Sequence, residues 1–457
     1  MRKIIALVIV LVLLTATSTF LTNTICGVTS TENTWITRTP MEQARSCLGV
    51  AAVNGKIYAI GGSAASGWAP SIPPSAAYGD INIGGIVGTN EEYNPLTDSW
   101  TYRASIPTPR MAFAIAVYDN KIYCIGGRST AGDTAVTEVY DPQTNTWEKK
   151  ASLPVAEAWL KAVTVVDTIH VLTYSGINYA YNPVSDSWST KASVPFPASG
   201  GYVLVSIDGK IHVVAGYLHA IYDSESDTWT TAMSPPSSNS GGAAEATSGI
   251  ISPKRIYLFG LPANLKQGEA QGFVRVYNPE TDSWEYGAHN AMNRYNFGVA
   301  SLNETFYVIG GHTYTFPGNF TPSKGVDLYI PIGHGNQPPE VKFLTLANQT
   351  YNQSTVSITF TTNKPFSWIG YSLNERENMT ITGNFTINDL PNGTHTLTVY
   401  ANDTLGNMGA SETIVFTVID TFPSTFAIGI IAIGIIITAA LSLLLLSRHQ
   451  KTSSISK

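Results

Sequence analysis

The chain has 457 residues, a formal net charge of −6 and only 13% charged residues, about half of the roughly 25% share of an average globular domain. No basic run stands out, so nucleic acid is not an expected partner. The cysteines, Cys26, Cys47 and Cys124, form neither a disulfide framework nor a zinc-ligand spacing, and the length allows one large domain with one or two smaller modules.

The first element in chain order is a predicted secretory leader over residues 1–25. Arg2 and Lys3 precede the apolar run Ile4–Leu14, and small residues follow that run. This order is typical of a signal peptide, because the apolar run is too short for a comfortable membrane span.

A motif that begins with Tyr and ends seven residues later with Trp then recurs along the chain. It reads YNPLTDSW at Tyr93–Trp100 and YDPQTNTW at Tyr140–Trp147, and further copies begin at Tyr181, Tyr222 and Tyr277. Each copy predicts a strand that ends at Tyr, a tight turn and a strand that begins at Trp. Such repetition indicates stacked units, none of which can bury its apolar face alone.

A second recurring element precedes each Tyr–Trp motif. NGKIYAIGG at Asn54–Gly62 and DNKIYCIGG at Asp119–Gly127 are its clearest copies, and weaker copies end at Gly176, Gly216, Gly260 and Gly311. The Asn-Gly and Asp-Asn pairs predict two-residue hairpin turns. The final glycines predict that the second strand ends where neighbouring backbones crowd.

Together these two elements resemble the kelch repeat, in which a diglycine follows the second strand of a four-stranded blade and Tyr and Trp mark the third and fourth. The sequence contains six second-strand elements but only five complete Tyr–Trp motifs, so the sixth blade lacks its Trp. Trp35, in contrast, has no blade before it. We therefore expect the strand around Trp35 to complete blade six and to close a six-bladed kelch-type β-propeller over residues 32–333. Closure leaves no open sheet edge.

A linker over residues 334–339 and an all-β sandwich over residues 340–420 are predicted next. The linker is rich in Gly and Pro, and the sandwich segments alternate apolar and polar residues. The stretch TVYANDTLGN at Thr398–Asn407 makes this module similar to the immunoglobulin-like modules of archaeal cell-surface proteins. That resemblance implies a stalk that carries the propeller.

Residues 426–446 contain no charge and predict a single C-terminal transmembrane helix. At about 1.5 Å per residue this stretch would span roughly 30 Å, the thickness of one hydrocarbon core. The basic residues of the following tail, residues 447–457, predict that the tail is cytoplasmic. We therefore expect a single-pass protein of the cell membrane, with propeller and sandwich outside.

Candidate N-glycosylation sites cluster in the predicted sandwich. Chance is one explanation in a sequence rich in Thr and Asn, but the clustering beside a predicted anchor favours real glycan acceptors. The Asn-x-Ser/Thr tripeptides begin at Asn303, Asn319, Asn348, Asn352, Asn378, Asn384, Asn392 and Asn402.

Candidate ligand-binding residues come from the end of the propeller where the loops into strand one and the loops between strands two and three meet. Counted back from the hairpin turns, Arg45, Arg110 and Arg294 occupy one equivalent position, and Glu157 occupies it in blade three. A ring of guanidinium groups would suit a carboxylate, a sulfate or an anionic sugar. The alternative is that the arginine is a structural part of the repeat.

Two long loops between strands two and three supply further candidates. Ser63–Asn90 contains Trp68, and His312–Lys324 contains Tyr314. Long loops in compact domains often carry function. These aromatic residues would stack on a sugar, anchor a protein or pack over the central channel.

We expect from the sequence a binding module for a glycan or protein ligand, with no cofactor and no metal site. The alternative is an extracellular carbohydrate-active enzyme of the kelch type. One model is a sialic-acid mutarotase, whose acid–base chemistry needs a group such as Glu157. Another is a copper-radical oxidase that resembles galactose oxidase, but Tyr123 and Cys124 would lie on opposite faces of one strand. A carboxylate or His with a shifted pKa in a cleft would favour an enzyme.

Overall fold

The computed structural model describes residues 32–66, 85–196, 201–237, 239–262, 273–290, 294–315, 319–419 and 436–444. It divides into two compact units, Met1–Gly335 and Asn336–Lys457. Each unit is described by itself below.

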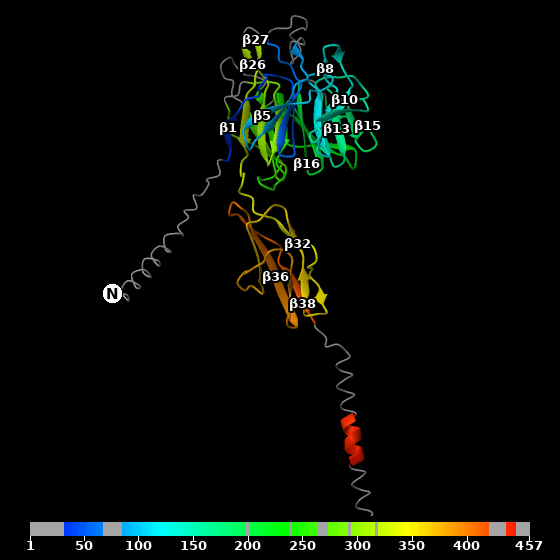
Figure 1. Cartoon of the computed structure of the whole chain (residues 1–457), viewed down its shortest axis with the longest axis vertical. Coiled ribbons are helices and arrows are strands. Elements are labelled where there is room, and N and C mark those ends of the chain that lie inside the picture. The colour runs from blue at the N-terminus through cyan, green and yellow to red at the C-terminus, as the bar shows by residue number, and fades with distance from the viewer. Residues whose placement is uncertain are drawn as a thin grey trace, which may run out of the picture. The chain divides into compact units, whose positions relative to one another are not determined.

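The described part of the first unit contains six four-stranded antiparallel sheets, here called blades one to six (Figure 1). Blade one contains, from the innermost strand outwards, β2 (Gly49–Val53), β3 (Lys56–Ile60), β4 (Asn90–Asn94) and β5 (Ser99–Arg103). Blade two contains, in the same order, β6 (Ala114–Tyr118), β7 (Lys121–Ile125), β10 (Thr137–Asp141) and β11 (Thr146–Lys150). Blade three contains β12 (Lys161–Val165), β13 (Thr168–Leu172), β14 (Asn178–Asn182) and β15 (Ser187–Lys191).

Blades four to six follow the same order, except that the outermost strand of blade six comes from the N-terminal end of the described chain. Blade four contains β16 (Tyr202–Ile207), β17 (Lys210–Ala215), β18 (Leu218–Asp223) and β19 (Thr228–Thr231). Blade five contains β20 (Asn239–Ala246), β21 (Ile256–Pro262), β22 (Phe273–Asn278) and β23 (Ser283–Tyr286). Blade six contains β24 (Gly298–Leu302), β25 (Thr305–Ile309), β28 (Val326–Ile330) and β1 (Thr34–Arg38). Two short ribbons, β8 (Arg128–Ser129) with β9 (Gly132–Asp133) and β26 (His312–Thr315) with β27 (Asn319–Pro322), extend from blades two and six.

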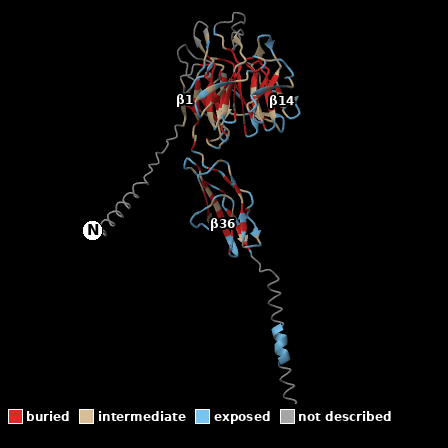
Figure 2. Ribbon diagram, viewed as in Figure 1, coloured by how far each residue is buried: buried red, intermediate tan, exposed pale blue. Residues whose placement is uncertain are grey.

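The innermost strands form a closed ring. Each contacts the innermost strand of the next blade, and the ring closes where β24 of blade six contacts β2 of blade one. These inner strands and their neighbours carry most of the buried residues of the unit (Figure 2). The architecture is therefore a six-bladed β-propeller, as the repeat predicts.

Strand β1 completes blade six, which confirms the prediction for Trp35. The strand pairs antiparallel with β28, and Trp35 lies opposite Tyr329. The Trp35 indole nitrogen donates a hydrogen bond to the Ala288 carbonyl oxygen at 2.9 Å, and the Tyr329 hydroxyl donates to the Asn33 side-chain oxygen at 2.7 Å. The first described strand thus closes the ring onto the last blade.

The Tyr–Trp motif joins each blade to the preceding one. In blade three the Tyr181 hydroxyl donates to Asp186 at 2.6 Å, and the same Asp186 oxygen accepts the Ala151 backbone N–H at 2.8 Å. The Trp188 indole then donates to the Ala151 carbonyl at 3.0 Å. Equivalent bonds start from Trp100, Trp147, Trp229 and Trp284, so we call this set of contacts the inter-blade clasp.

The second unit is all-β in its described strands. It contains a six-stranded sheet and two two-stranded sheets around one core that includes Ile358, Leu397 and Val399. Its strands are β29 (Val341–Phe343), β30 (Thr350–Tyr351), β31 (Val356–Ile358), β32 (Phe360–Thr362), β33 (Trp368–Leu373), β34 (Met379–Thr380), β35 (Phe385–Ile387), β36 (Gly393–Asn402), β37 (Met408–Ala410) and β38 (Ile414–Val418).

The expected C-terminal transmembrane helix is contradicted. Among the residues that the structure describes, no helix is both long enough and apolar enough to cross a membrane. The prediction of single-pass membrane localisation, with the membrane as a partner, is therefore wrong on this finding. The leader, residues 1–25, lies outside the described residues.

Candidate binding site at the mouth of the central channel

The predicted arginines lie inside their own blades. Arg45 donates to the Glu91 carboxylate at 2.8 Å and to the Gly61 carbonyl at 2.8 Å, and both charged side chains are 0% exposed. Arg110 pairs with Glu138 at 2.5 Å and donates to the Cys124 carbonyl at 2.8 Å. Each arginine thus ties the loop before strand one to strand three of the same blade.

Blade six repeats this arrangement, and blade three lacks it. Arg294 pairs with Asp327 and donates to the Gly310 carbonyl at 2.8 Å. The three carboxylates all lie two residues before the Tyr of strand three, where blade three has Tyr179. The burial and pairing favour the structural alternative for these arginines, and their role toward a ligand stays a prediction.

Glu157 occupies the arginine position of blade three and is half-buried. Its carboxylate accepts the Tyr174 backbone N–H at 2.7 Å, and burial raises its pKa above the ordinary value of a glutamate. Of the loop candidates, Trp68 lies outside the described residues, and Tyr314 lies in the ribbon β26–β27 opposite Phe320.

A chain of backbone hydrogen bonds surrounds part of the channel mouth. Two residues before strand one, Cys47, Ala112, Trp159 and Asn296 all adopt the left-handed conformation, with φ of 54°, 53°, 63° and 51°. Cys47 N–H donates to the Asn296 carbonyl, Ala112 to that of Cys47, and Trp159 to that of Ala112, at 2.9, 2.9 and 2.7 Å. These bonds link blades six, one, two and three in sequence and fix the side chains at the rim.

The diglycines let the blades approach one another just outside this rim. Gly62 N–H donates to the Arg110 carbonyl of the next blade at 3.0 Å. Gly61 has a φ of +60°, and a Cβ on it would lie 2.6 Å from the same carbonyl oxygen. Only glycine therefore fits at this position without a shift of the backbone.

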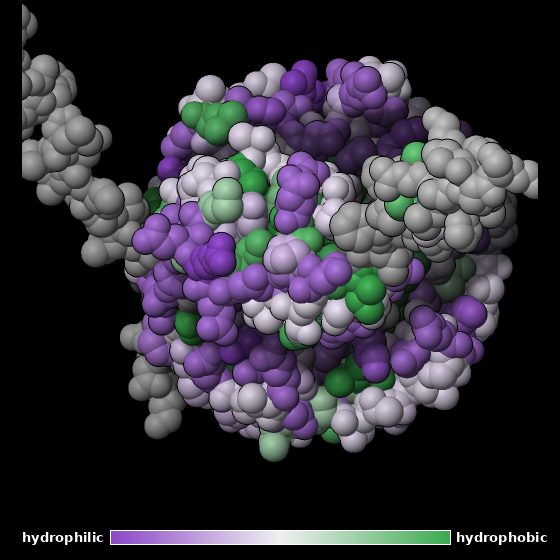
Figure 3. Space-filling model, turned by 90° about the horizontal axis from the view of Figure 1, so that it is seen from below, coloured by the Kyte–Doolittle hydropathy of each residue, from purple (hydrophilic) through white to green (hydrophobic). Residues whose placement is uncertain are grey.

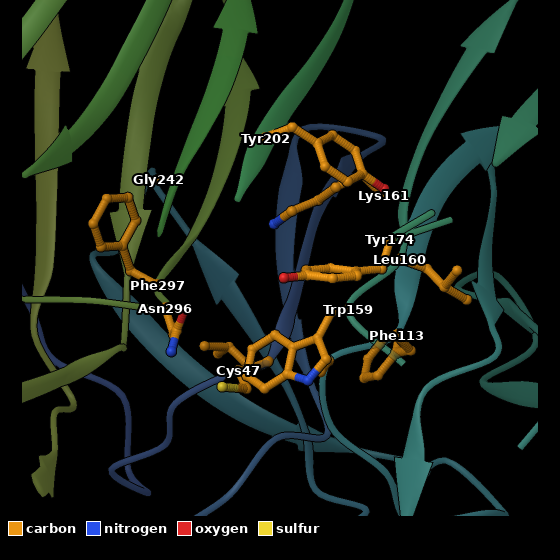
Figure 4. A pocket seen from close by; sticks show the side chains of 12 residues that line it. Cys47, Phe113, Trp159, Leu160, Lys161, Tyr174, Tyr202, Gly242, Asn296 and Phe297 are labelled. Atoms are coloured by element: carbon orange, nitrogen blue, oxygen red, sulfur yellow. The ribbon is translucent and has the colours of Figure 1, made fainter. Parts of the chain in front are cut away.

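A cavity of about 70 Å³ opens at the channel mouth, inside the rim. Its lining includes Trp159, Lys161, Tyr174, Tyr202 and Asn296. Figure 4 shows the Lys161 amine and the Tyr174 hydroxyl extending in the same direction, with Asn296 and Phe297 across the space from them. The cavity combines one amine, an amide and several aromatic rings, a set that suits a partly apolar ligand with an anionic or hydrogen-bonding group.

Burial controls the protonation of two groups in this cavity. It lowers the pKa of the Lys161 amine, and it raises the pKa of the Cys47 thiol to about 12. Cys47 is a free cysteine and stays a thiol at neutral pH, so it is not an activated nucleophile.

The sequence interpretation missed Lys161, Trp159 and Tyr174. A signal was present, because Lys161 is the first residue of a strand whose counterparts in blades one, two and six begin with Gly49, Ala114 and Gly298. A comparison of the first strands in register would have found it.

Comparison with known proteins supports the kelch repeat directly. A family model described as Kelch motif matches residues 44–72 and 109–154, which lie in blades one and two. Influenza virus NS1A-binding protein of Homo sapiens is 36% identical over 94 residues, 21% of this chain and 12% of the relative. Beta-scruin of Limulus polyphemus is 33% identical over 96 residues, 21% of this chain and 9% of the relative.

Kelch-like protein 33 of Homo sapiens is also similar, with 29% identity over 98 residues, 21% of this chain and 15% of the relative. The chain thus matches only a small part of the length of these relatives. The match and the fold agree on the repeat itself: the chain contains kelch repeats.

Proposed function

We propose that the propeller is a protein-interaction module that binds its partner at the loop face, around the mouth of the central channel. The observation that carries this proposal is the kelch repeat, because one relative with the same repeat is named for the binding of another protein. A second support is the cavity that contains Trp159 and Tyr174, since Trp and Tyr are enriched at the centres of protein interfaces.

The surface seen from below is mostly hydrophilic. In the view of Figure 3, hydrophilic and neutral residues cover most of the visible surface, and apolar residues lie in small separate groups. Contiguous apolar patches usually mark flat docking surfaces. The surface visible in this view therefore presents no broad apolar docking patch.

Site-specific photo-crosslinking in cells that make the full chain tests this proposal. The photoreactive residue p-benzoylphenylalanine replaces Tyr174 or Val155 at the loop face, and Val166, which is 78% exposed at the opposite end of blade three, is the matched control position. We expect protein adducts from the loop-face positions and none from position 166. Adducts at position 166 alone, or at no position, would contradict the proposal.

A glycan is the second candidate for the same face. The rings of Trp159 and Tyr174 and the amide of Asn296 are the groups that stack on a sugar and hydrogen-bond its hydroxyls. An array of glycans probed with the purified chain separates the two candidates, because only a glycan-binding propeller gives signals that a Trp159→Ala substitution removes.

We also propose that the second unit is an immunoglobulin-like spacer of the archaeal surface type and that it carries glycans. The acceptor asparagines Asn348, Asn352, Asn378, Asn384 and Asn392 are exposed, and Asn402 is only half-exposed. Intact-protein mass spectrometry of the natively produced chain is the test. A mass equal to that of the unmodified polypeptide would exclude the glycans.

A further inference from the structure

A second cavity, of about 230 Å³, continues into the channel below the mouth. Its walls are the innermost strands, and most of its lining is aliphatic, with Val50, Val163, Val205 and Val299 among the residues. It shares Leu48, Phe113, Leu160, Lys161 and Phe297 with the mouth cavity. The two spaces therefore adjoin at Lys161, and the mouth is the entry to the deeper cavity.

Two side chains in this aliphatic wall are ionisable, and the repeat itself shows that the fold does not need them. Lys161 pairs with Leu172 in its blade, and the residues at this level in the other blades are Gly49, Ala114, Val203, Ala243 and Gly298. Glu245 pairs with Tyr257, and its counterparts are Ala51, Ala116, Val163, Val205 and Ala300. At the positions equivalent to Lys161 and Glu245, all of the remaining blades have small or aliphatic residues.

Neither ionisable side chain has a structural partner in the part of the chain that the structure describes. Burial alone perturbs Glu245, whose pKa it raises to about 8, and the only charged-group effect on Lys161 comes from the Cys47 thiol. Both side chains are partly buried, and a charge withdrawn from water without a partner is costly, in contrast to the paired arginines of blades one, two and six.

We propose that the channel binds a small organic carboxylate whose carboxylate group pairs with Lys161 and whose second oxygen, a hydroxyl or carbonyl, hydrogen-bonds with Glu245. We expect the carboxylate of the ligand to lie nearer the mouth and its second oxygen to lie deeper in the channel. In blade five, Ala243 lies at the level of Lys161, and Glu245 lies two residues further along the same strand, away from the mouth. The volume of about 230 Å³ lies below the range of roughly 300–1,000 Å³ for drug-sized ligands. This volume selects a short aliphatic hydroxy or oxo acid.

The charge of the site selects an anion over a cation. At neutral pH most Glu245 carboxyl groups hold their proton, because their pKa is about 8, and a protonated carboxyl donates a hydrogen bond. Burial lowers the pKa of the Lys161 amine, and a bound carboxylate would favour its protonated form and pair with it.

Calorimetry and thermal denaturation of the full chain test the site with three probes, L-lactate, pyruvate and L-malate, as sodium salts against sodium chloride of equal ionic strength. We expect at least one probe to bind the wild-type chain with a Kd of about 1 mM or tighter. Lys161→Ala, which copies Ala114, should weaken that binding at least tenfold. Glu245→Ala should reduce the affinity of the bound probe to the affinity of acetate, which has no hydroxyl or carbonyl group besides its carboxylate. The exposed Lys149 gives the matched control, Lys149→Ala, which should bind as the wild type does.

The melting temperature without ligand separates a ligand site from a structural role. Lys161→Ala and Glu245→Ala should each leave it unchanged or raise it, because each removes a partly buried polar group that no described residue pairs. The proposal is overturned if none of the three probes binds the wild-type chain, if binding survives Lys161→Ala, or if both substitutions lower the melting temperature. None of these outcomes depends on a protein partner at the loop face, so the failure of one proposal leaves the other standing.

Discussion

At the scale of single residues, each blade acts as a control for the others. Arg45, Arg110 and Arg294 each pair with a carboxylate two residues before the Tyr of their blade. Blade four has Ala220 at the position of those carboxylates. The charged pair therefore stabilises some blades and is dispensable in others, which makes its contribution measurable by substitution.

Arg110→Ala should destabilise the propeller. It leaves the Glu138 carboxylate, which is only 7% exposed, without its cation, and such a loss costs roughly 3–5 kcal/mol. Urea denaturation of the single variant and of Arg110→Ala with Glu138→Ala measures the effect, and the double variant should recover much of the loss. Arg103→Ala is the control, because Arg103 is 35% exposed in its pair with Glu92. If Arg110→Ala instead weakens ligand binding at an unchanged melting temperature, the ligand role of Arg110 is supported.

The pair His212 and His219 should make blade four sensitive to acid. Burial, followed by the neighbouring His219, lowers the pKa of His212 to about 3, and the two rings meet at 2.9 Å against Tyr277 and Trp284. The unfolded chain binds this proton near pH 6.5, so the stability is present above that pH and is lost as the pH falls from 6.5 towards 3. At pH 5 the loss from His212 should reach about 2 kcal/mol.

Urea midpoints at pH 7.5 and pH 5 measure this loss. His212→Tyr is the matched variant, because Tyr58, Tyr123, Tyr257 and Tyr307 occupy the same position in other blades. The variant should lose less stability than the wild type at pH 5. Equal losses would show that His212 does not titrate during acid unfolding.

Two cations show what the sequence cannot reveal about a binding site. Arg45 and Lys161 are both cations in a chain with few charges, and their spacing does not reveal whether a carboxylate meets them. Glu91 satisfies Arg45 from another strand at 2.8 Å, whereas no recorded carboxylate satisfies Lys161. Burial and pairing depend on the fold, so the sequence directed attention to the paired cation and away from the unpaired one.

At the scale of elements, the inter-blade clasp explains why the Tyr–Trp motif has a fixed length. The turn residue before the fourth strand must accept two hydrogen bonds at once, and it adopts a left-handed conformation, with a φ of 49° at Asp186 and 56° at Asn145. Asp and Asn tolerate this conformation and offer a side-chain oxygen. A longer or shorter turn would move that oxygen away from both donors.

Asp186→Ala should therefore cost more than Asp186→Asn. Alanine leaves the part-buried Tyr181 hydroxyl and the exposed Ala151 N–H without their acceptor, and the loss of each hydrogen bond costs roughly 0.5–1.5 kcal/mol. Asparagine should be nearly neutral, because Asn145 accepts the equivalent bonds in blade two at 2.7 and 2.8 Å. Chemical denaturation of both variants gives the comparison, and equal costs would mean that the clasp depends on the charge of Asp186 and not on its oxygen.

At the scale of the whole molecule, counting repeats predicted the propeller because blades are built from local signals. Hairpin turns and the Tyr–Trp motif lie within a few residues of each other in the sequence. Blade six has no Trp after its third strand, and this absence indicated that Trp35 supplies the fourth strand. Hydropathy over residues 426–446 was a weaker guide, because no helix among the described residues is both long enough and apolar enough to cross a membrane. Local pattern thus sufficed for repeated antiparallel pairing, but not for the C-terminal segment or for the contents of the channel.

Closure of the ring should be essential for a monomeric propeller. Deletion of residues 30–42 removes β1, and with it the contacts of Trp35 with Phe259 and Tyr329, whose ring centroids lie 5.9 and 4.9 Å away. It also exposes β28 as an unpaired edge, and free edges pair with other chains. We expect the deleted chain to elute as oligomers or aggregates in size-exclusion chromatography with light scattering. Deletion of residues 1–29, which spares β1, should leave a monomer of unchanged melting temperature.

A single substitution tests the Trp35 side chain apart from the backbone pairing of β1. Trp35→Ala keeps the backbone pairing with β28 but removes the indole that donates to Ala288, so we expect a closed monomer that is less stable by up to about 3–5 kcal/mol. If the chain without residues 30–42 stays monomeric and melts at the wild-type temperature, blade six does not need its N-terminal strand. In that case the ring is held by the inner strands β24 and β2, which contact each other directly.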